Sequence, residues 1–84
     1  MDRASAKTII ASEGLERAIW FQRPNGKPDA VAIYEIDQGL RVVSTDERAV
    51  EVGARDYEDE SEALDMFITL LRDLKELIAS GVVR

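Results

Sequence analysis

A long amphipathic segment near the end of the chain constrains the fold more than any other feature. Between Asp59 and Gly81, large apolar side chains recur every three or four residues, which predicts a helix of about 20 residues. Asp59 stands three residues before Glu62, the spacing of a capping box with aspartate in place of serine or threonine. Gly81 lies where a helix commonly stops. In a chain of 84 residues, which has room for one core and a single domain (1–84), such a helix must cover a sheet.

The apolar face of this helix is wider than one sheet requires. At 100° per residue its side chains sweep roughly 200°, whereas a stripe of about 100° suffices to dock a helix. They are Ala63, Leu64, Phe67, Ile68, Leu70, Leu71, Leu74, Leu77 and Ile78. We expect the surplus to be covered by an N-terminal helix or by a second copy of the chain.

The preceding residues predict a small antiparallel sheet. Three segments rich in β-branched and aromatic residues (17–22, 30–37 and 40–45) are typical of strands. A hairpin loop around Asn25 and Gly26 is expected to join the first two, and a turn at 37–39 the next two. Residues 48–52 predict a short edge strand or, alternatively, an irregular charged edge. With a short helix over 4–11 that ends near Gly14, the predicted fold is α+β: a three- or four-stranded antiparallel sheet packed against a long C-terminal helix, with a short N-terminal helix.

Negative charge is concentrated in one part of the chain. Residues 51–65 contain seven carboxylates and one arginine, a local charge of −6 that equals the net charge of the whole sequence. Such a surface attracts basic partners and repels nucleic acid and anionic membranes. Carboxylates at a helix start also stabilise the helix dipole, so part of the acidic run has a structural explanation.

The composition argues against several classes of active site. The sequence has no cysteine and no histidine, which removes thiolate chemistry and the commonest general base and metal ligand. The alternating acids do not fit a calcium loop, because the positions that need glycine and glutamate hold Ser61 and Phe67. We therefore expect no enzyme activity, no cofactor and no metal. Without an apolar leader or membrane span, the chain is expected to be soluble and cytoplasmic.

Candidate partner-binding residues lie in two charged segments. Asp46, Glu47 and Arg48 follow the third predicted strand and are expected to form a rigid corner near the acidic residues of the run at 57–62. The structural alternative is that Arg48 makes a local salt bridge that shapes the turn.

Aromatic side chains supply candidate anchors. Trp20 and Phe21 are adjacent and should point to opposite faces of a strand, which leaves one ring near the surface unless the N-terminal helix covers it. Tyr57 opens the acidic run and is the other candidate.

Several short motifs together resemble a family of small bacterial immunity proteins from polymorphic-toxin and contact-dependent or secreted antibacterial toxin systems. The family pattern has an Asn-Gly turn before a proline, an aromatic-rich strand, a Glu-Arg-Gly-like corner, and an acidic segment before an aromatic-apolar helix. The corresponding residues are Ile19-Trp20, 25–30, 33–35, 39–42, Asp46-Glu47-Arg48 and 57–67. Ala49 stands where the pattern has glycine, and Leu40-Arg41-Val42 where it has tryptophan.

The resemblance implies that the chain binds and neutralises a cognate toxin domain. On this hypothesis the acidic surface steers a basic toxin, while aromatic side chains supply desolvated contact. The implied partner-binding residues are Trp20, Asp46, Glu47, Arg48, Tyr57, Glu58, Asp59 and Glu60. Two alternatives stay open: an acidic nucleic-acid mimic that inhibits a DNA- or RNA-binding protein, and a homodimeric, chaperone-like module that pairs through the C-terminal helix.

Overall fold

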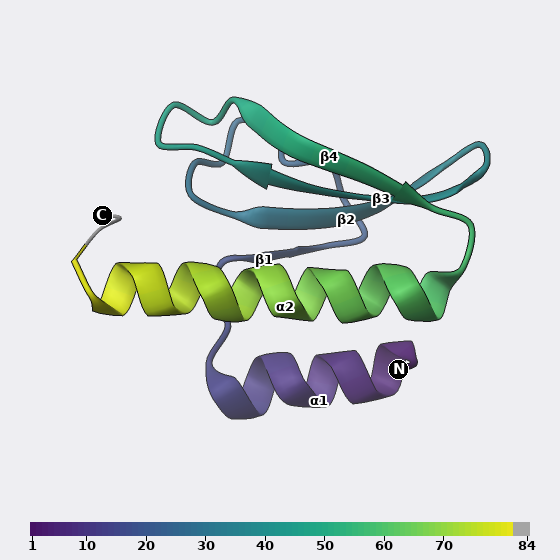
Figure 1. The fold of residues 1–84 in the computed structure, drawn as a ribbon, viewed down its shortest axis with the longest axis horizontal. Coiled ribbons are helices and arrows are strands. Elements are labelled where there is room, and N and C mark those ends of the chain that lie inside the picture. The colour runs from purple at the N-terminus through teal and green to yellow at the C-terminus, as the bar shows by residue number, and fades with distance from the viewer. Residues whose placement is uncertain (82–84) are drawn as a thin grey trace.

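The computed structural model describes residues 1–81, in which two helices and four strands are found (Figure 1). In chain order they are α1 (Arg3–Glu13), β1 (Ala18–Trp20), β2 (Val31–Ile36), β3 (Gly39–Thr45), β4 (Glu51–Tyr57) and α2 (Glu60–Ala79). The strands form one mixed, mostly antiparallel sheet in the order β1-β2-β3-β4. The predicted α+β fold is confirmed.

Local capping determines where α2 begins and ends, as the sequence predicts. A side-chain oxygen of Asp59 accepts a hydrogen bond from the backbone N–H of Ser61 at 2.8 Å. Beyond the other end, Gly81 has a φ of 80° and its N–H donates to the carbonyl of Ile78. The fully buried residues of α2 are Ala63, Leu64, Phe67, Ile68 and Leu71.

β1 pairs with β2 in parallel, so the predicted hairpin between them is wrong. Asn25 and Gly26 do adopt left-handed turn conformations, with φ values of 52° and 82°. The chain, however, has already left the sheet at Phe21, whose φ is 52°. It then returns to place Val31 beside Ala18, at the start of both strands. Because residues 21–30 carry the chain back past the length of β1, β2 enters the sheet at the same end as β1 and the two strands are parallel.

β4 lies further along the chain than the predicted strand at 48–52. Residues 46–50 form the turn after β3 instead, and the strand covers Glu51–Tyr57. The β3–β4 pairing is irregular between Val42 and Ser44, where Gly53 adopts a φ of 63°. Such a bulge increases the local twist of an edge strand. β4 is the last strand of the sheet, and its residues are exposed except for half-buried Tyr57.

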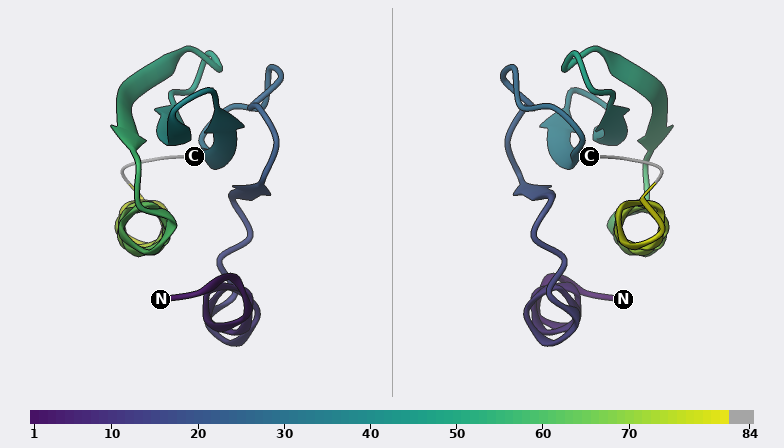
Figure 2. Two further views of the ribbon diagram at one scale, coloured as in Figure 1. Left: turned by 90° about the vertical axis from the view of Figure 1, so that its right-hand side faces the viewer. Right: turned by 90° about the vertical axis from the view of Figure 1, so that its left-hand side faces the viewer.

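Both helices lie on one side of the sheet and run side by side in the same direction (Figures 1 and 2). Arg3 and Glu60 pair near their starts, and Glu13 and Arg72 pair further along. The main core fills the space between sheet and helices, and its largest fully buried side chain is Phe67. The predicted N-terminal helix is thus confirmed, and it covers one side of α2.

The opposite face of the sheet carries a smaller apolar cluster, made of Ile19, Ala30, Ala32, Tyr34 and Val43. The β1–β2 connection covers part of it, since the guanidinium carbon of Arg23 lies 4.8 Å from the centre of the Tyr34 ring. The hydroxyl of Thr45 donates to the carbonyl of Lys27 at 2.8 Å and fixes this connection to β3.

Candidate functional site

The predicted charged corner is the turn between β3 and β4, and Asp46 organises its backbone. One carboxylate oxygen accepts hydrogen bonds from the N–H groups of Val50 at 2.9 Å and Arg48 at 2.8 Å. These bonds favour the ionised form and lower the pKa of Asp46. Ala49, in the same turn, has a φ of 63°, a conformation that favours glycine. Asp46 therefore holds the turn together from within.

Glu47 and Arg48 project from this turn and are exposed. The ion pairs found in residues 1–81 do not include Arg48, so the local salt bridge considered for it is absent there. The backbone N–H of Arg48, and not its guanidinium, binds Asp46. The Glu47 and Arg48 side chains are thus available to a partner.

Two carboxylates of the acidic run form two-point ion pairs within the protein. Glu60 binds Arg3 with distances of 2.7 and 3.1 Å, and Asp56 binds Arg41 with distances of 2.7 and 3.0 Å. The arginine hydrogen bonds lower the pKa of both Glu60 and Asp56. With Asp59 committed to capping α2, much of the acidic run serves the fold.

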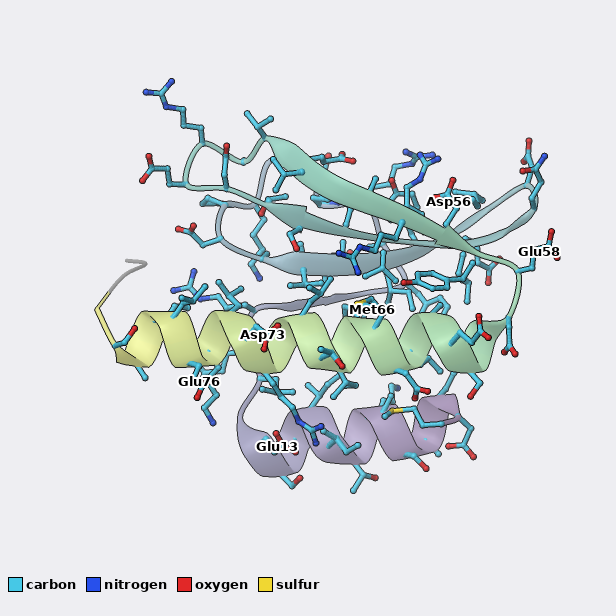
Figure 3. All side chains as sticks on the ribbon, viewed as in Figure 1. Glu13, Asp56, Glu58, Met66, Asp73 and Glu76 are labelled. Carbon is cyan, nitrogen blue, oxygen red and sulfur yellow. The ribbon has the colours of Figure 1, made fainter. Side chains whose placement is uncertain are left out.

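The corner and the acidic run lie at opposite ends of β4. Glu51 pairs with Thr45 at one end of the strand, and Tyr57 pairs with Leu40 at the other. Seven residues at roughly 3.3 Å each span about 20 Å. Figure 3 shows Glu58 at the link between β4 and α2, beyond the far end of that strand. The expectation that the corner lies near the run at 57–62 is therefore wrong.

Trp20 and Phe21 pack together, and do not point to opposite faces. Their ring centres are 4.8 Å apart in an edge-to-face arrangement, because the positive φ of Phe21 turns the chain. Trp20 also lies 6.1 Å from the Phe67 ring of α2. From α1, the guanidinium carbon of Arg3 lies 3.9 Å from the Phe21 ring centre, and Lys7 lies 5.7 Å from that of Trp20. The alternative that the N-terminal helix covers the second ring is confirmed, and both rings are half-buried.

A surface that the sequence did not single out lies between β4 and α2, on the side seen in Figure 3. We call it the β4–α2 face. Its apolar members are Val52, Met66, Leu70, Leu74 and Leu77, and its charged members are Arg55, Glu58, Glu62 and Asp73. Val52 pairs with Ser44 and Arg55 with Val42, so both project from the side of the sheet that α2 covers.

The apolar members of this face are incompletely covered. Val52 is 45% exposed and Leu77 is 44% exposed, while Met66, Leu70 and Leu74 are half-buried. A guanidinium nitrogen of Arg55 lies 3.4 Å from the sulfur of Met66, which joins β4 to this side of α2.

The acidic members border this apolar strip. At 100° per residue, Glu62, Asp73, Met66, Leu77 and Leu70 fall within about 80° of the helix circumference. Figure 3 shows Asp73 on the front of α2, whereas Glu76 lies at the lower edge of the helix, away from β4 and outside this face. Within residues 1–81, no ion pair involves Glu58, Glu62, Asp73 or Glu76. The sequence signal for this surface is the apolar arc of α2, which is wider than one sheet requires. α1 covers the surplus on one side of the helix and leaves the other side uncovered.

Residues 1–81 contain no group of three or more side chains placed to hold a metal ion. In the same range, no helix combines the length and apolar character needed to cross a membrane. A hollow of about 320 Å³ beside the α1–β1 link is lined by Leu15, Arg17 and Lys75, among others, and is open to solvent.

Comparison of the chain with protein-family models, curated proteins and solved structures found no match.

Proposed function

We propose that this chain is an immunity protein, which binds a cognate antibacterial toxin domain and neutralises it through an acidic surface. The observation that carries the proposal is the β4–α2 face, where carboxylates without an ion pair in residues 1–81 border exposed apolar side chains. Unmatched charge beside unmatched apolar surface is typical of a protein-binding site. The chain would act by occupying a partner, without catalysis or a cofactor.

The partner would be basic. Toxins that act on nucleic acids carry positive clefts, and a net charge of −6 attracts such a surface over a long range. The same charge repels nucleic acid and anionic membranes, so neither is a direct partner. An immunity protein of this kind works in the cytoplasm of the producing cell and its siblings.

The candidate contact residues differ in how freely they can serve a partner. Glu58 is exposed and Tyr57 half-buried beside the β4–α2 face, whereas Glu47 and Arg48 are exposed at the distant turn. The other candidates, Trp20, Asp46, Asp59 and Glu60, already have partners within the fold. Substituting these four would change stability together with binding.

Co-expression with the toxin domain encoded in the neighbouring gene tests the proposal. Cells that produce the toxin domain should grow only when this chain is also produced, and the two proteins should elute as one stoichiometric complex. A complex that survives 1 M salt, a concentration that screens exposed charges beyond about 3 Å, would indicate buried apolar contact. Continued toxicity without a complex would refute the immunity function.

A second candidate is an acidic nucleic-acid mimic that occupies the groove of a DNA- or RNA-binding protein. The observation in its favour is that the carboxylates do not stop at the start of α2, since Asp65, Asp73 and Glu76 continue along its exposed side. A mimic relies on charge, so its complex should dissociate as salt rises and should be displaced by duplex DNA. Resistance to both would leave the immunity function as the better account.

A further inference from the structure

We propose that the β4–α2 face is the docking surface, and that its occupant is a basic amphipathic segment of the partner that presents apolar side chains beside lysine or arginine. This inference rests on the proposed function and deepens it. It moves the contact surface away from the charged corner, and it states the chemistry of the segment that binds.

One side of α2 is incompletely covered by the described residues. The same helix buries Phe67 and Leu71 completely, yet leaves Leu77 at 44% exposure. On β4, Val52 is 45% exposed and projects from the side of the sheet that α2 covers. Burial of exposed leucine and valine against a partner is favourable by roughly 25 cal/mol for each Å² removed from water. The occupant therefore needs apolar side chains of its own.

The charges around this strip are mostly negative. Glu58, Glu62 and Asp73 are exposed on the face, and Arg55 lies against Met66. An occupant with positive side chains would pair with these carboxylates at the rim while its apolar side chains fill the centre. An acidic or neutral segment would bury the same carboxylates without compensation.

A second copy of this chain fits the face less well. Two copies related by a twofold axis would place this face against itself, so Glu62 and Asp73 of one copy would meet an equally acidic surface on the other. Like charges brought together in this way disfavour the contact. Charge complementarity therefore selects a basic partner.

The open edge of β4 is not where the occupant adds on as a strand. The bulge at Gly53 interrupts the regular ladder, and charged Arg55 and Asp56 follow it along the edge. Bulges and charges on edge strands are features that discourage pairing with another strand. Contact would run through side chains across the face.

Matched substitutions test this assignment with the toxin domain of the neighbouring gene as the probe. The double variant Glu62→Lys/Asp73→Lys should slow association about tenfold or more and flatten its salt dependence. Glu16→Lys/Asp37→Lys makes the same change in net charge at exposed positions outside the face, and should retain near-wild-type kinetics. Equal effects of the two doubles would overturn the proposal, because steering would then depend on net charge alone.

Apolar substitutions probe the centre of the face. Leu77→Ser should raise the dissociation rate about tenfold, the effect expected of a residue that anchors an interface. Val50→Ser removes an exposed valine, at 54% exposure, from the β3–β4 turn and should have little effect. Loss of affinity in Val50→Ser and not in Leu77→Ser would place the interface at the corner instead. Thermal unfolding of each variant confirms that it is folded.

Two further measurements separate failure of this inference from failure of the immunity function. Wild-type protein should sediment as a monomer, and a dimer that Leu77→Ser converts to monomer would identify a second copy as the occupant. A 14-residue peptide that alternates leucine and lysine in a helical pattern should shift NMR signals at Val52 and residues 70–77. NMR shifts at exposed carboxylates throughout the protein, including Asp37 and Glu47, would show that the peptide binds by charge alone. That result would overturn the assignment of the docking surface even if no toxin is found.

Discussion

The two sides of α2 differ in how completely the rest of the chain covers and pairs their side chains. On the side of α1, Arg72 is paired with Glu13, and Ala6 of α1 is fully buried. On the side of β4, Leu77 is largely exposed and Asp73 has no ion pair within residues 1–81. Both sides belong to one regular helix, so its amphipathic pattern alone does not explain the difference.

What differs is the neighbour on each side. α1 supplies a matching apolar surface and matching charges along most of its length, whereas β4 contacts α2 near Tyr57 and Arg55. Because the stability of the chain depends on the side of α2 that faces α1, the side that faces β4 can serve a partner. Substitutions on the two sides should therefore separate stability from binding.

The largest expected difference is between two leucines of α2. Leu71→Ala removes a side chain that is 1% exposed and should lower the free energy of unfolding by about 2–5 kcal/mol. Leu77→Ala makes the same chemical change at a largely exposed position and should cost less than about 1 kcal/mol. Urea denaturation followed by circular dichroism measures both. Equal losses would mean that the two sides of α2 are equally covered.

Added volume should discriminate between the α1–α2 contact and the exposed strand β4. Ala6→Leu places a larger side chain in the α1–α2 contact, where Ala6 is fully buried, and should destabilise the protein by about 1–3 kcal/mol. Ala54→Leu makes the same change on exposed β4 and should stay within about 0.5 kcal/mol of wild type. A large loss in Ala54→Leu would show that β4 is covered.

Low pH should weaken the contact between α1 and α2. Hydrogen bonds from Arg72 lower the pKa of Glu13, so the stabilisation is present above the ordinary glutamate pKa of about 4.3 and is lost as pH falls through the folded-state value. The unfolding temperature should fall between pH 6 and pH 3, and less steeply in Glu13→Gln. Asp73→Asn is the matched control, and it should follow the wild-type profile. The effect should be smaller than that of Ala6→Leu, because the pair is exposed to solvent.

The smallest expected effect is a gain at the β3–β4 turn, which lies away from both sides of α2. Ala49 has a φ of 63°, which costs a non-glycine residue about 1–2 kcal/mol, while glycine loses more backbone entropy on folding. Ala49→Gly should therefore stabilise the protein by about 0.5 kcal/mol without changing binding. A lower unfolding temperature would indicate that this turn adopts another conformation.

The features that the sequence predicts well are those encoded locally. The extent of α2 follows from Asp59, Gly81 and a regular 3.6-residue pattern, all of which act within a few residues. The end of α1 follows from Gly14 for the same reason, and Gly14 is left-handed with a φ of 62°. Local hydrogen bonds form in much the same way whatever surrounds them.

Strand direction was not encoded in this local way. Alternating apolar residues suit a parallel and an antiparallel strand equally, and the Asn25-Gly26 turn that suggested a hairpin lies within a longer connection. β4 was misplaced because an exposed edge strand has no buried face to give it an alternating pattern. The predicted proximity of Arg48 to Glu58 failed with it, since those residues lie beyond opposite ends of β4.

The pairing of α1 with α2 also determines when the hydrophobic core can close during synthesis of the chain. Arg3 and Glu60 are 57 positions apart, and Glu13 and Arg72 are 59 apart. α1 must therefore wait until α2 has been synthesised, with the side that carries Ala6 uncovered in the meantime. The core closes only after that point, so a chain that stalls before α2 would expose apolar surface and attract chaperones or proteases.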